Sequence, residues 1–470
     1  MSLLFTLFLV FGTAEAVVRY IYKRSFDPST DLSLLPGVFY LLFGESFIAK
    51  PVFHLPVITF LVLSLCILVN FFFRLVIKSI TFLKCRFISL SGIALFLLLC
   101  GFLLGFGETL IDNIYKQILP PSDVRLPIVT FDRETMDSRN HHFSRLKNRN
   151  VLIFLVESYG YTAYSKPEHY IPLKPFFKEM EKKLKSAGYD ILSHFLTSPV
   201  IAGGSWLADA TLLTGIKIDT QQAYEELLNS NANSLPIIFH NASYYTLLAA
   251  PGTIHGEWEE GRLFYGFDET ILGWNYGYEG PVFSFVPIPD QFAIYTIHKL
   301  RLAKNEADPI FIQYTLVSSH GPFNRIPAYI EDWSKLGDGS IYYDSPNLYF
   351  NNDWFSGEAY GEGYVAAIRY ALMVITNYLT GFIDDETLII LVGDHQPMFP
   401  IAEREAPFSV PIHIISRSRS LIEPLTSYGY TYGLIPEQKL PHPGMETFFY
   451  TVLEIIDGSD IDETLRSRLK

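Results

Sequence analysis

Residues 151–157 read VLIFLVE, an uninterrupted apolar run that ends in a carboxylate. Its length and its Val, Ile and Leu content are typical of a strand that is buried on both faces. Similar runs recur at 191–199 (ILSHFLTSP), 244–250 (YYTLLAA), 309–317 (PIFIQYTLV), 387–393 (TLIILVG) and 410–416 (VPIHIIS). Helical patterns occupy 172–188, 363–384 and 445–457. This alternation predicts an α/β domain built on a mostly parallel sheet with helices on both faces.

Polar side chains follow several of these strands at the point where each ends. Glu157 ends the first strand, Asp394 and His395 follow a later one, and His320 comes shortly after another. Any one of these residues alone is more simply explained as a solvated carboxylate or a loop residue. The carboxyl ends of strands in an open α/β sheet form the binding edge, so we expect the side chains to converge there. Glu157, Asp394 and His395 offer the oxygen and nitrogen ligands that Zn²⁺ or Mn²⁺ accepts, which predicts a metal site.

A glycine pair precedes a serine in the segment 199–215, PVIAGGSWLADATLLTG. Gly203 and Gly204 free the backbone from ordinary steric limits, and Gly215 is a typical helix stop. One interpretation is that Ser205 is the N-cap of the helix that follows. The other is that Ser205 is a nucleophile and the fourth metal ligand, placed at a helix start that favours a phosphate group.

The first hundred residues contain segments long enough to cross a membrane. Residues 55–73 and 87–106 carry no charge, and each can span a hydrocarbon core of roughly 30 Å. Residues 3–18 and 33–49 are further candidates, although each contains a glutamate. We therefore expect three or four transmembrane helices within residues 1–108.

Basic residues between the two uncharged segments indicate the orientation. The loop contains Arg74, Lys78, Lys84 and Arg86. By the positive-inside rule this loop is cytoplasmic, so the chain after residue 106 is exported from an inner (cytoplasmic) membrane. We expect a juxtamembrane connector at 109–149, a catalytic domain at 150–457 and a C-terminal tail at 458–470, with 325–360 as an insertion outside the core.

The charge and cysteine content restrict the function of the exported part. Residues 1–108 hold 8 basic and 5 acidic residues, a net charge of +3, so the total of −13 leaves −16 for the rest. An acidic domain of this kind is a poor candidate for nucleic-acid binding. The three cysteines, Cys66, Cys85 and Cys100, lie in or beside the predicted spans and leave none for a disulfide in the exported part.

Four motifs, in the order NVLIFLVES, GGSWLADATLLTG, SSHGPF and VGDHQP, resemble the alkaline phosphatase/sulfatase superfamily. The similar branch is the membrane-anchored one typified by lipoteichoic acid synthase and the lipid A phosphoethanolamine transferases, and the resemblance covers about residues 150–457. It implies membrane helices followed by an exported α/β catalytic domain. It also implies one divalent metal ion, Zn²⁺ or Mn²⁺, held by Glu157, Asp394, His395 and the nucleophile Ser205.

The resemblance also implies residues that contact the substrate. His320 matches a histidine that contacts the substrate phosphate or the leaving group. His255, Trp258 and Arg262, in IHGEWEEGR, lie near the positions of a His/Trp/Arg set that binds the head group in the lipoteichoic acid branch, although their spacing differs.

Two positions depart from the pattern of the transferase branches. Those branches usually have threonine in place of Ser205 and glycine in place of Gln396. True sulfatases convert a Cys or Ser in C/S-x-P-x-R to formylglycine, but here Trp-Leu-Ala-Asp follows Ser205. The sequence therefore argues against sulfate-ester hydrolysis by that route.

The resulting functional hypothesis is a membrane-anchored, metal-dependent phosphotransferase. It would take the head group of a membrane phospholipid, carry it as a phosphoserine, and pass it to an exported envelope glycan or lipid. One alternative is a phosphatase or phosphodiesterase, in which water is the acceptor. Another is a non-catalytic membrane sensor built on the same fold.

Overall fold

The computed structural model describes residues 2–31, 143, 145–146, 149–253, 258–304, 308–350, 358–383 and 387–457. The chain divides into two compact units, Met1–Val129 and Thr130–Lys470. The described part of the first unit consists of helix α1 (Ser2–Tyr22) and the short helix α2 (Pro28–Asp31).

Most of the predicted membrane part cannot be compared with the structure. The apolar segment predicted at 3–18 lies within α1. The segments predicted at 33–49, 55–73 and 87–106, with the loop between the last two, lie outside the described residues. Among the described residues, one stretch is long and apolar enough to cross a membrane, Gly361–Phe382 in helix α15 (Glu358–Phe382). Most of that stretch is buried inside the second unit, as expected of a core helix.

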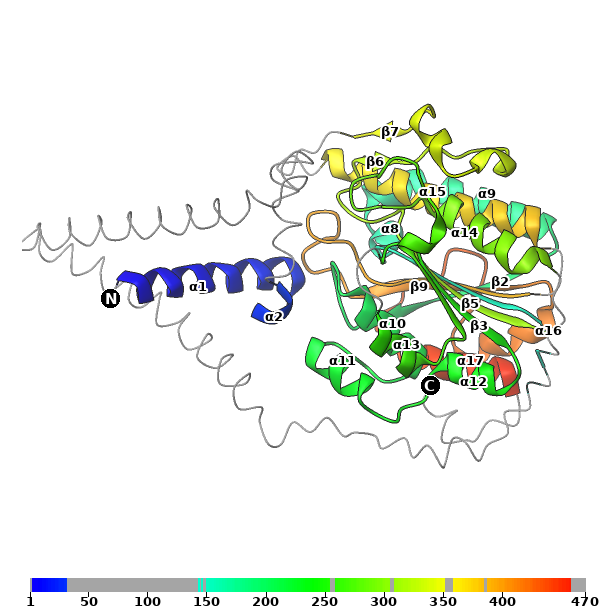
Figure 1. Ribbon diagram of the computed structural model, residues 1–470, viewed down its shortest axis with the longest axis horizontal. Coiled ribbons are helices and arrows are strands. Elements are labelled where there is room, and N and C mark those ends of the chain that lie inside the picture. The colour runs from blue at the N-terminus through cyan, green and yellow to red at the C-terminus, as the bar shows by residue number, and fades with distance from the viewer. Residues whose placement is uncertain are drawn as a thin grey trace, which may run out of the picture. The chain divides into compact units, whose positions relative to one another are not determined.

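The second unit is built on a central sheet that lies between helices (Figure 1). This sheet has eight strands in the order β10-β2-β9-β8-β1-β5-β3-β4. Its strands are β1 (Val151–Val156), β2 (Asp190–Thr197), β3 (Tyr245–Ala250), β4 (Glu269–Leu272), β5 (Ile310–Leu316), β8 (Leu388–Gly393), β9 (Ser409–Ser416) and β10 (Thr431–Tyr432). The strands β6 (Arg325–Ile326) and β7 (Leu348–Tyr349) form a separate antiparallel pair.

The sheet is mixed, which confirms the prediction of a mostly parallel sheet only in part. The strands β8, β1, β5, β3 and β4 run parallel to one another, whereas β9 is antiparallel to both β8 and β2, and β10 is antiparallel to β2. The reason is the connection from β8 to β9, which contains no helix to carry the chain back to the starting edge. Two successive reversals restore the direction of β2, so its carboxyl end lies at the same edge as that of β1.

Helices cover both faces of the sheet, as the sequence predicts (Figure 1). One face carries α8 (Thr162–Ser165), α9 (Pro167–Ser186), α14 (Asp290–Leu300) and α15. The other carries α10 (Ser205–Thr214), α11 (Gln221–Leu228), α12 (Leu235–Asn241), α13 (Glu259–Tyr265), α16 (Arg419–Ile422) and α17 (Thr447–Asp457). Short 3₁₀ turns are η3 (Gly273–Tyr276), η4 (Leu302–Lys304), η5 (Trp333–Leu336), η6 (Ser340–Tyr343) and η7 (Glu423–Tyr428).

The two cores explain why β1 has no polar residue. Leu152, Phe154 and Val156 face one hydrophobic core, and the alternate residues face the other. A strand covered on both faces must be apolar at every position. The predicted insertion at 325–360 is partly wrong, because Trp333 and Tyr342 in this segment are buried in the first of these cores.

Candidate active site

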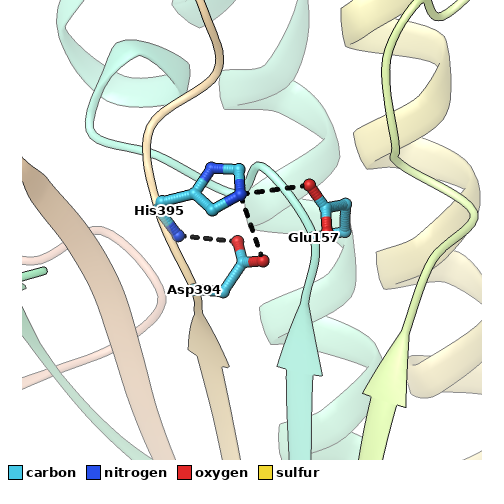
Figure 2. Close-up of side chains that lie close together, drawn as sticks. All are labelled: Glu157, Asp394 and His395. Atoms are coloured by element: carbon cyan, nitrogen blue, oxygen red, sulfur yellow. Dashed lines mark hydrogen bonds and ion pairs between the residues drawn. The ribbon is translucent and has the colours of Figure 1, made fainter. Parts of the chain in front are cut away.

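Three side chains from two adjacent strand ends form a compact buried cluster (Figure 2). Glu157 follows β1, and Asp394 and His395 follow β8, the parallel neighbour of β1. His395 Nε2 lies 3.2 Å from Glu157 Oε1 and 3.5 Å from Asp394 Oδ2. One ligand atom from each residue lies within 4.8 Å of the other two, which is compact enough to hold a metal ion.

Backbone groups hold the two carboxylates in place. Asp394 Oδ1 accepts hydrogen bonds from the backbone N–H of Ser158 at 2.8 Å and of His395 at 2.6 Å. The Ser158 hydroxyl donates to Glu157 Oε1 at 3.0 Å. Gly393 allows the chain segments after β1 and at the end of β8 to lie close together, because a Cβ at this position would lie 1.9 Å from the Tyr159 carbonyl oxygen.

Ser205 completes the cluster from a third strand end. Gly203 and Gly204 have φ of 143° and 79°, so the turn before α10 uses backbone conformations that favour glycine. Ser205 Oγ lies 3.2 Å from Glu157 Oε2 and 3.3 Å from His395 Nε2. The N-cap of α10 is Gly204, and no side chain caps this helix. The interpretation of Ser205 as an N-cap is therefore wrong, because its hydroxyl points into the cluster.

The ionisable side chains of the cluster shift one another's pKa values. Burial alone would raise the pKa of Glu157, but the positive charge of His395 lowers it below its ordinary value. Burial and the adjacent charge of Glu157 raise the pKa of Asp394 to about 7. Burial opposes the charge on His395, but the charges of Asp394 and Glu157 raise its pKa to about 10. The cluster therefore holds a proton on His395 at neutral pH, at the position where a cation would bind.

The donor set fits a divalent metal ion. Two carboxylates and one imidazole, with a serine oxygen as the fourth group, are acceptable ligands for Zn²⁺ or Mn²⁺. His395 Nδ1 lies 2.9 Å from the Gln396 carbonyl, so Nδ1 carries a hydrogen and Nε2 is the nitrogen that would bind the ion once its own proton is displaced. Buried carboxylates of like charge are costly unless a cation neutralises them.

His320 lies near the cluster. Its side chain is exposed, its Nδ1 lies 2.6 Å from the Gly321 carbonyl, and its ring packs beside Phe285. Its positive charge contributes to lowering the pKa of Glu157. The preceding Ser319 hydroxyl donates to the Glu157 carbonyl at 2.6 Å, so the loop after β5 is tied to the same strand end.

The predicted head-group residues are only partly placed. His255 lies outside the described residues. Trp258 precedes α13 with φ of 44°, and its ring stacks on Tyr265 at 5.6 Å. Arg262 is exposed on α13, and within the described residues no hydrogen bond joins its side chain to the cluster. The part of these residues in binding a head group therefore stays a prediction.

One nearby residue was not identified from the sequence, and the contacts of another could not be predicted. Asp209 lies one helical turn after Ser205, and burial together with the charges of Asp394 and Glu157 raises its pKa. Its signal was the four-residue spacing from Ser205, which places both on one face of α10. The other is Gln396, whose hydrogen bonds could not be read from the sequence.

No protein-family model matches the chain, and no curated protein matches its sequence. Among solved structures, the chain is similar to the lipoteichoic acid synthase LtaP from Listeria monocytogenes, at 17% identity over 67% of this chain and 73% of that one, with a TM-score of 0.43. It is similar to a protein of the alkaline phosphatase superfamily from Vibrio parahaemolyticus, at 15% identity over 66% of each chain, with a TM-score of 0.40.

A third similar structure is the periplasmic domain of EptC from Escherichia coli in complex with Zn, at 12% identity over 66% of this chain and 82% of that one, with a TM-score of 0.43. These are distant likenesses.

Proposed function

We propose that this chain is a metal-dependent phosphotransferase with Ser205 as its nucleophile. The observation that carries the proposal is the position of Ser205 Oγ, within 3.3 Å of both Glu157 Oε2 and His395 Nε2. A serine with only a structural role would not need its hydroxyl to lie among buried candidate metal ligands.

Each residue has a defined part in the proposed reaction. Glu157, Asp394, His395 and Ser205 would hold one Zn²⁺ or Mn²⁺. When bound, the ion would make the Ser205 hydroxyl more acidic and offset the negative charge of a phosphate group. Glu157 Oε2 orients the hydroxyl by accepting its hydrogen bond.

The transfer itself would proceed in two steps. In the first, Ser205 gives up its hydroxyl proton to solvent, the bond from Oγ to phosphorus forms as the bond from phosphorus to the lipid alcohol breaks, and His320 gives a proton to the leaving oxygen. The N–H groups at the start of α10 stabilise the phosphoryl oxygens. In the second step, an acceptor hydroxyl attacks the phosphorus, its proton passes to His320, and the bond from phosphorus to Oγ breaks, which restores Ser205.

The proposed donor and acceptor follow from the membrane segments. The uncharged segments 55–73 and 87–106 would anchor the chain in the inner membrane, with the catalytic unit exported. An anchored site meets phospholipids at high local concentration, so the donor would be a membrane phospholipid and the acceptor an envelope glycan or lipid. His255, Trp258 and Arg262 would contact the head group.

The deciding experiment uses the purified full chain in lipid nanodiscs that contain phospholipid labelled in its acyl chains. We expect diacylglycerol to form when Zn²⁺ or Mn²⁺ is present, and to stop forming after chelation. Adding an envelope acceptor should yield an acceptor product that carries the head group. Release of free phospho-head group without an acceptor product would identify a hydrolase of the same superfamily. Metal binding without any turnover would favour the non-catalytic sensor.

A further inference from the structure

Gln396 directly follows Asp394 and His395, two of the candidate metal ligands. Its side chain is completely buried, beside the cluster of Glu157, Asp394 and His395. A large polar side chain in this position must find hydrogen-bond partners, because burying an unpaired amide is costly.

The backbone of Gln396 connects two of the loops that carry site residues. Its carbonyl accepts a hydrogen bond from the Ala202 N–H at 2.9 Å and lies 2.9 Å from His395 Nδ1. Ile201 forms an isolated parallel β-bridge with Gln396. The loop that leads to Ser205 is therefore fastened directly to the residue after His395, and the same carbonyl fixes the tautomer of that histidine.

The side chain of Gln396 connects the third loop. Its Oε1 accepts a hydrogen bond from the Thr162 N–H at 3.0 Å, and its Nε2 donates to the Pro407 carbonyl at 2.9 Å. Thr162 begins α8, five residues after Glu157, and Pro407 shortly precedes β9. The amide oxygen and the amide nitrogen of Gln396 thus each form a hydrogen bond with a backbone group.

The absence of a side chain at Gly160 makes room for the Gln396 side chain. A Cβ at Gly160 would lie 2.1 Å from Gln396 Oε1 and 2.8 Å from its Cα. The turn after β1 therefore requires glycine at 160 for the Gln396 side chain to lie where it does. The two positions are complementary in volume.

We propose that Gln396 is a positioning residue that holds the loops of Glu157, Ser205 and His395 at the spacing needed for metal binding and nucleophilic attack. The proposal rests on the proposed function for the identity of the reaction, and on the hydrogen bonds above for the role of Gln396. It predicts that loss of the amide weakens the metal site even though Gln396 touches no metal ligand through its side chain.

Gln291 is a matched control for the loss of a buried amide. It is also completely buried, and its side chain likewise bonds a backbone N–H and C=O, both of Ile330, at 2.9 and 2.7 Å. Ile330 lies before η5, a third partner is the Tyr342 hydroxyl of η6 at 3.4 Å, and among the described residues no hydrogen bond joins the Gln291 side chain to the four site residues. Gln396→Ala and Gln291→Ala remove the same chemical group and should lower the melting temperature to a similar extent.

The test is Zn²⁺ titration of the metal-free full chain by calorimetry, with melting temperature and steady-state kinetics measured on the same preparations. We expect Gln396→Ala to raise the Kd for Zn²⁺ about tenfold, at the low end for residues that support metal ligands, because the variant loses the amide contacts to Thr162 and Pro407 but keeps the backbone carbonyl behind His395. We expect kcat to fall with little change in KM, because the binding surface for the lipid is untouched. Gln291→Ala should leave both the Kd and kcat within about twofold of wild type.

Two results would overturn the proposal. One is an unchanged Kd in Gln396→Ala, and the other is an equal weakening in Gln291→Ala, which would reduce the effect to general stability. If Gln396→Ala does not fold, Gln396→Met decides, because it keeps the volume, adds no charge and still removes both amide hydrogen bonds. Its Kd should also rise, and an unchanged Kd would again reject the proposal. If wild type binds Zn²⁺ but transfers no head group, the proposed function fails while the affinity comparison still decides the role of Gln396.

Discussion

Ser205 Oγ lies 3.3 Å from His395 Nε2, although 190 residues separate them in the chain. The two residues come from different strand ends, β2 and β8, which the sheet brings to one edge. The hydroxyl also donates to Glu157 Oε2, so it contacts both a carboxylate and the imidazole of the candidate metal site. This arrangement leads to a test that separates chemistry from stability.

Replacement of Ser205 by alanine should abolish turnover in a folded protein. The hydroxyl does not cap α10, so its loss should cost less than the roughly 1 kcal/mol that is typical of a lost N-cap. Diacylglycerol release from acyl-labelled phospholipid should disappear, and so should the phosphoserine that forms with phospholipid labelled in its phospho-head group. Ser205→Thr is the matched control, since it keeps a hydroxyl and should retain turnover. Substantial head-group release by Ser205→Ala would refute the nucleophile.

Metal affinity should rise with pH. A metal ion must displace the proton from His395 Nε2, and the pKa of His395 is about 10 in the metal-free cluster. We expect log K to increase by about one per pH unit between pH 7 and 9. Below about pH 7 the dependence should steepen toward about two, because Asp394 is then protonated as well.

Calorimetry at several pH values, each in two buffers of different ionisation enthalpy, measures both the affinity and the protons released. At pH 8 about one proton should be released per metal ion bound. An affinity that does not change from pH 7 to 9, with no proton release, would show that the imidazole of His395 is not a ligand.

Gly393 should not tolerate a side chain. A Cβ there would lie 1.9 Å from the Tyr159 carbonyl oxygen, a backbone atom that cannot move without displacing the end of β1. Gly393→Ala should therefore shift Asp394 away from Glu157, lower the melting temperature and weaken metal binding.

Gly381 provides the opposite case in the same domain. It lies in α15, and a Cβ there would meet nothing within 4 Å. Gly381→Ala should stabilise the protein by about 0.5–1 kcal/mol and leave metal binding unchanged. The expectation is wrong if both alanine variants behave alike in thermal denaturation and Zn²⁺ titration.

The sequence predicts well those features that depend on local pattern. The apolar run at 151–157 is β1, buried on both faces, and the glycine pair before Ser205 has the positive φ expected of it. The strand-end residues Glu157, Asp394 and His395 lie together because the ends of parallel neighbours share one edge.

Features that depend on chain direction or distant partners could not be predicted in this way. Nothing in VPIHIIS shows that β9 runs antiparallel, because an apolar strand has the same composition in either direction. Likewise, the contact between Gly160 and Gln396 joins loops more than 200 residues apart in the sequence, and only the folded chain brings them together.

The membrane orientation has a direct test. The basic loop between 55–73 and 87–106 should be cytoplasmic, and residues 109–470 should be exported. A phosphatase-type reporter fused near residue 130 should be active, and one fused near residue 80 should be inactive. Activity at residue 80, or none at residue 130, would reverse the orientation and remove the proposed site from its envelope substrates.

Asp290 should make stability depend on pH. Its carboxylate accepts hydrogen bonds from the N–H groups of Val317 and Ser318, at 2.9 and 3.0 Å, and so supports the loop that leads to His320. Burial raises its pKa to about 6 from an ordinary 3.8, against the lowering effect of these hydrogen bonds. The folded state therefore binds this proton more tightly than the unfolded state does.

It follows that the Asp290 contribution to stability falls as pH rises from about 4 to about 6, by roughly 3 kcal/mol for a shift of about two units. The loss is complete above that window. Asp290→Asn carries no such charge, so its melting temperature should vary less than that of wild type across this range. Asp308→Asn, which changes an exposed carboxylate, should follow wild type. Parallel curves for wild type and Asp290→Asn between pH 4 and 6.5 would show that Asp290 is not the group that titrates.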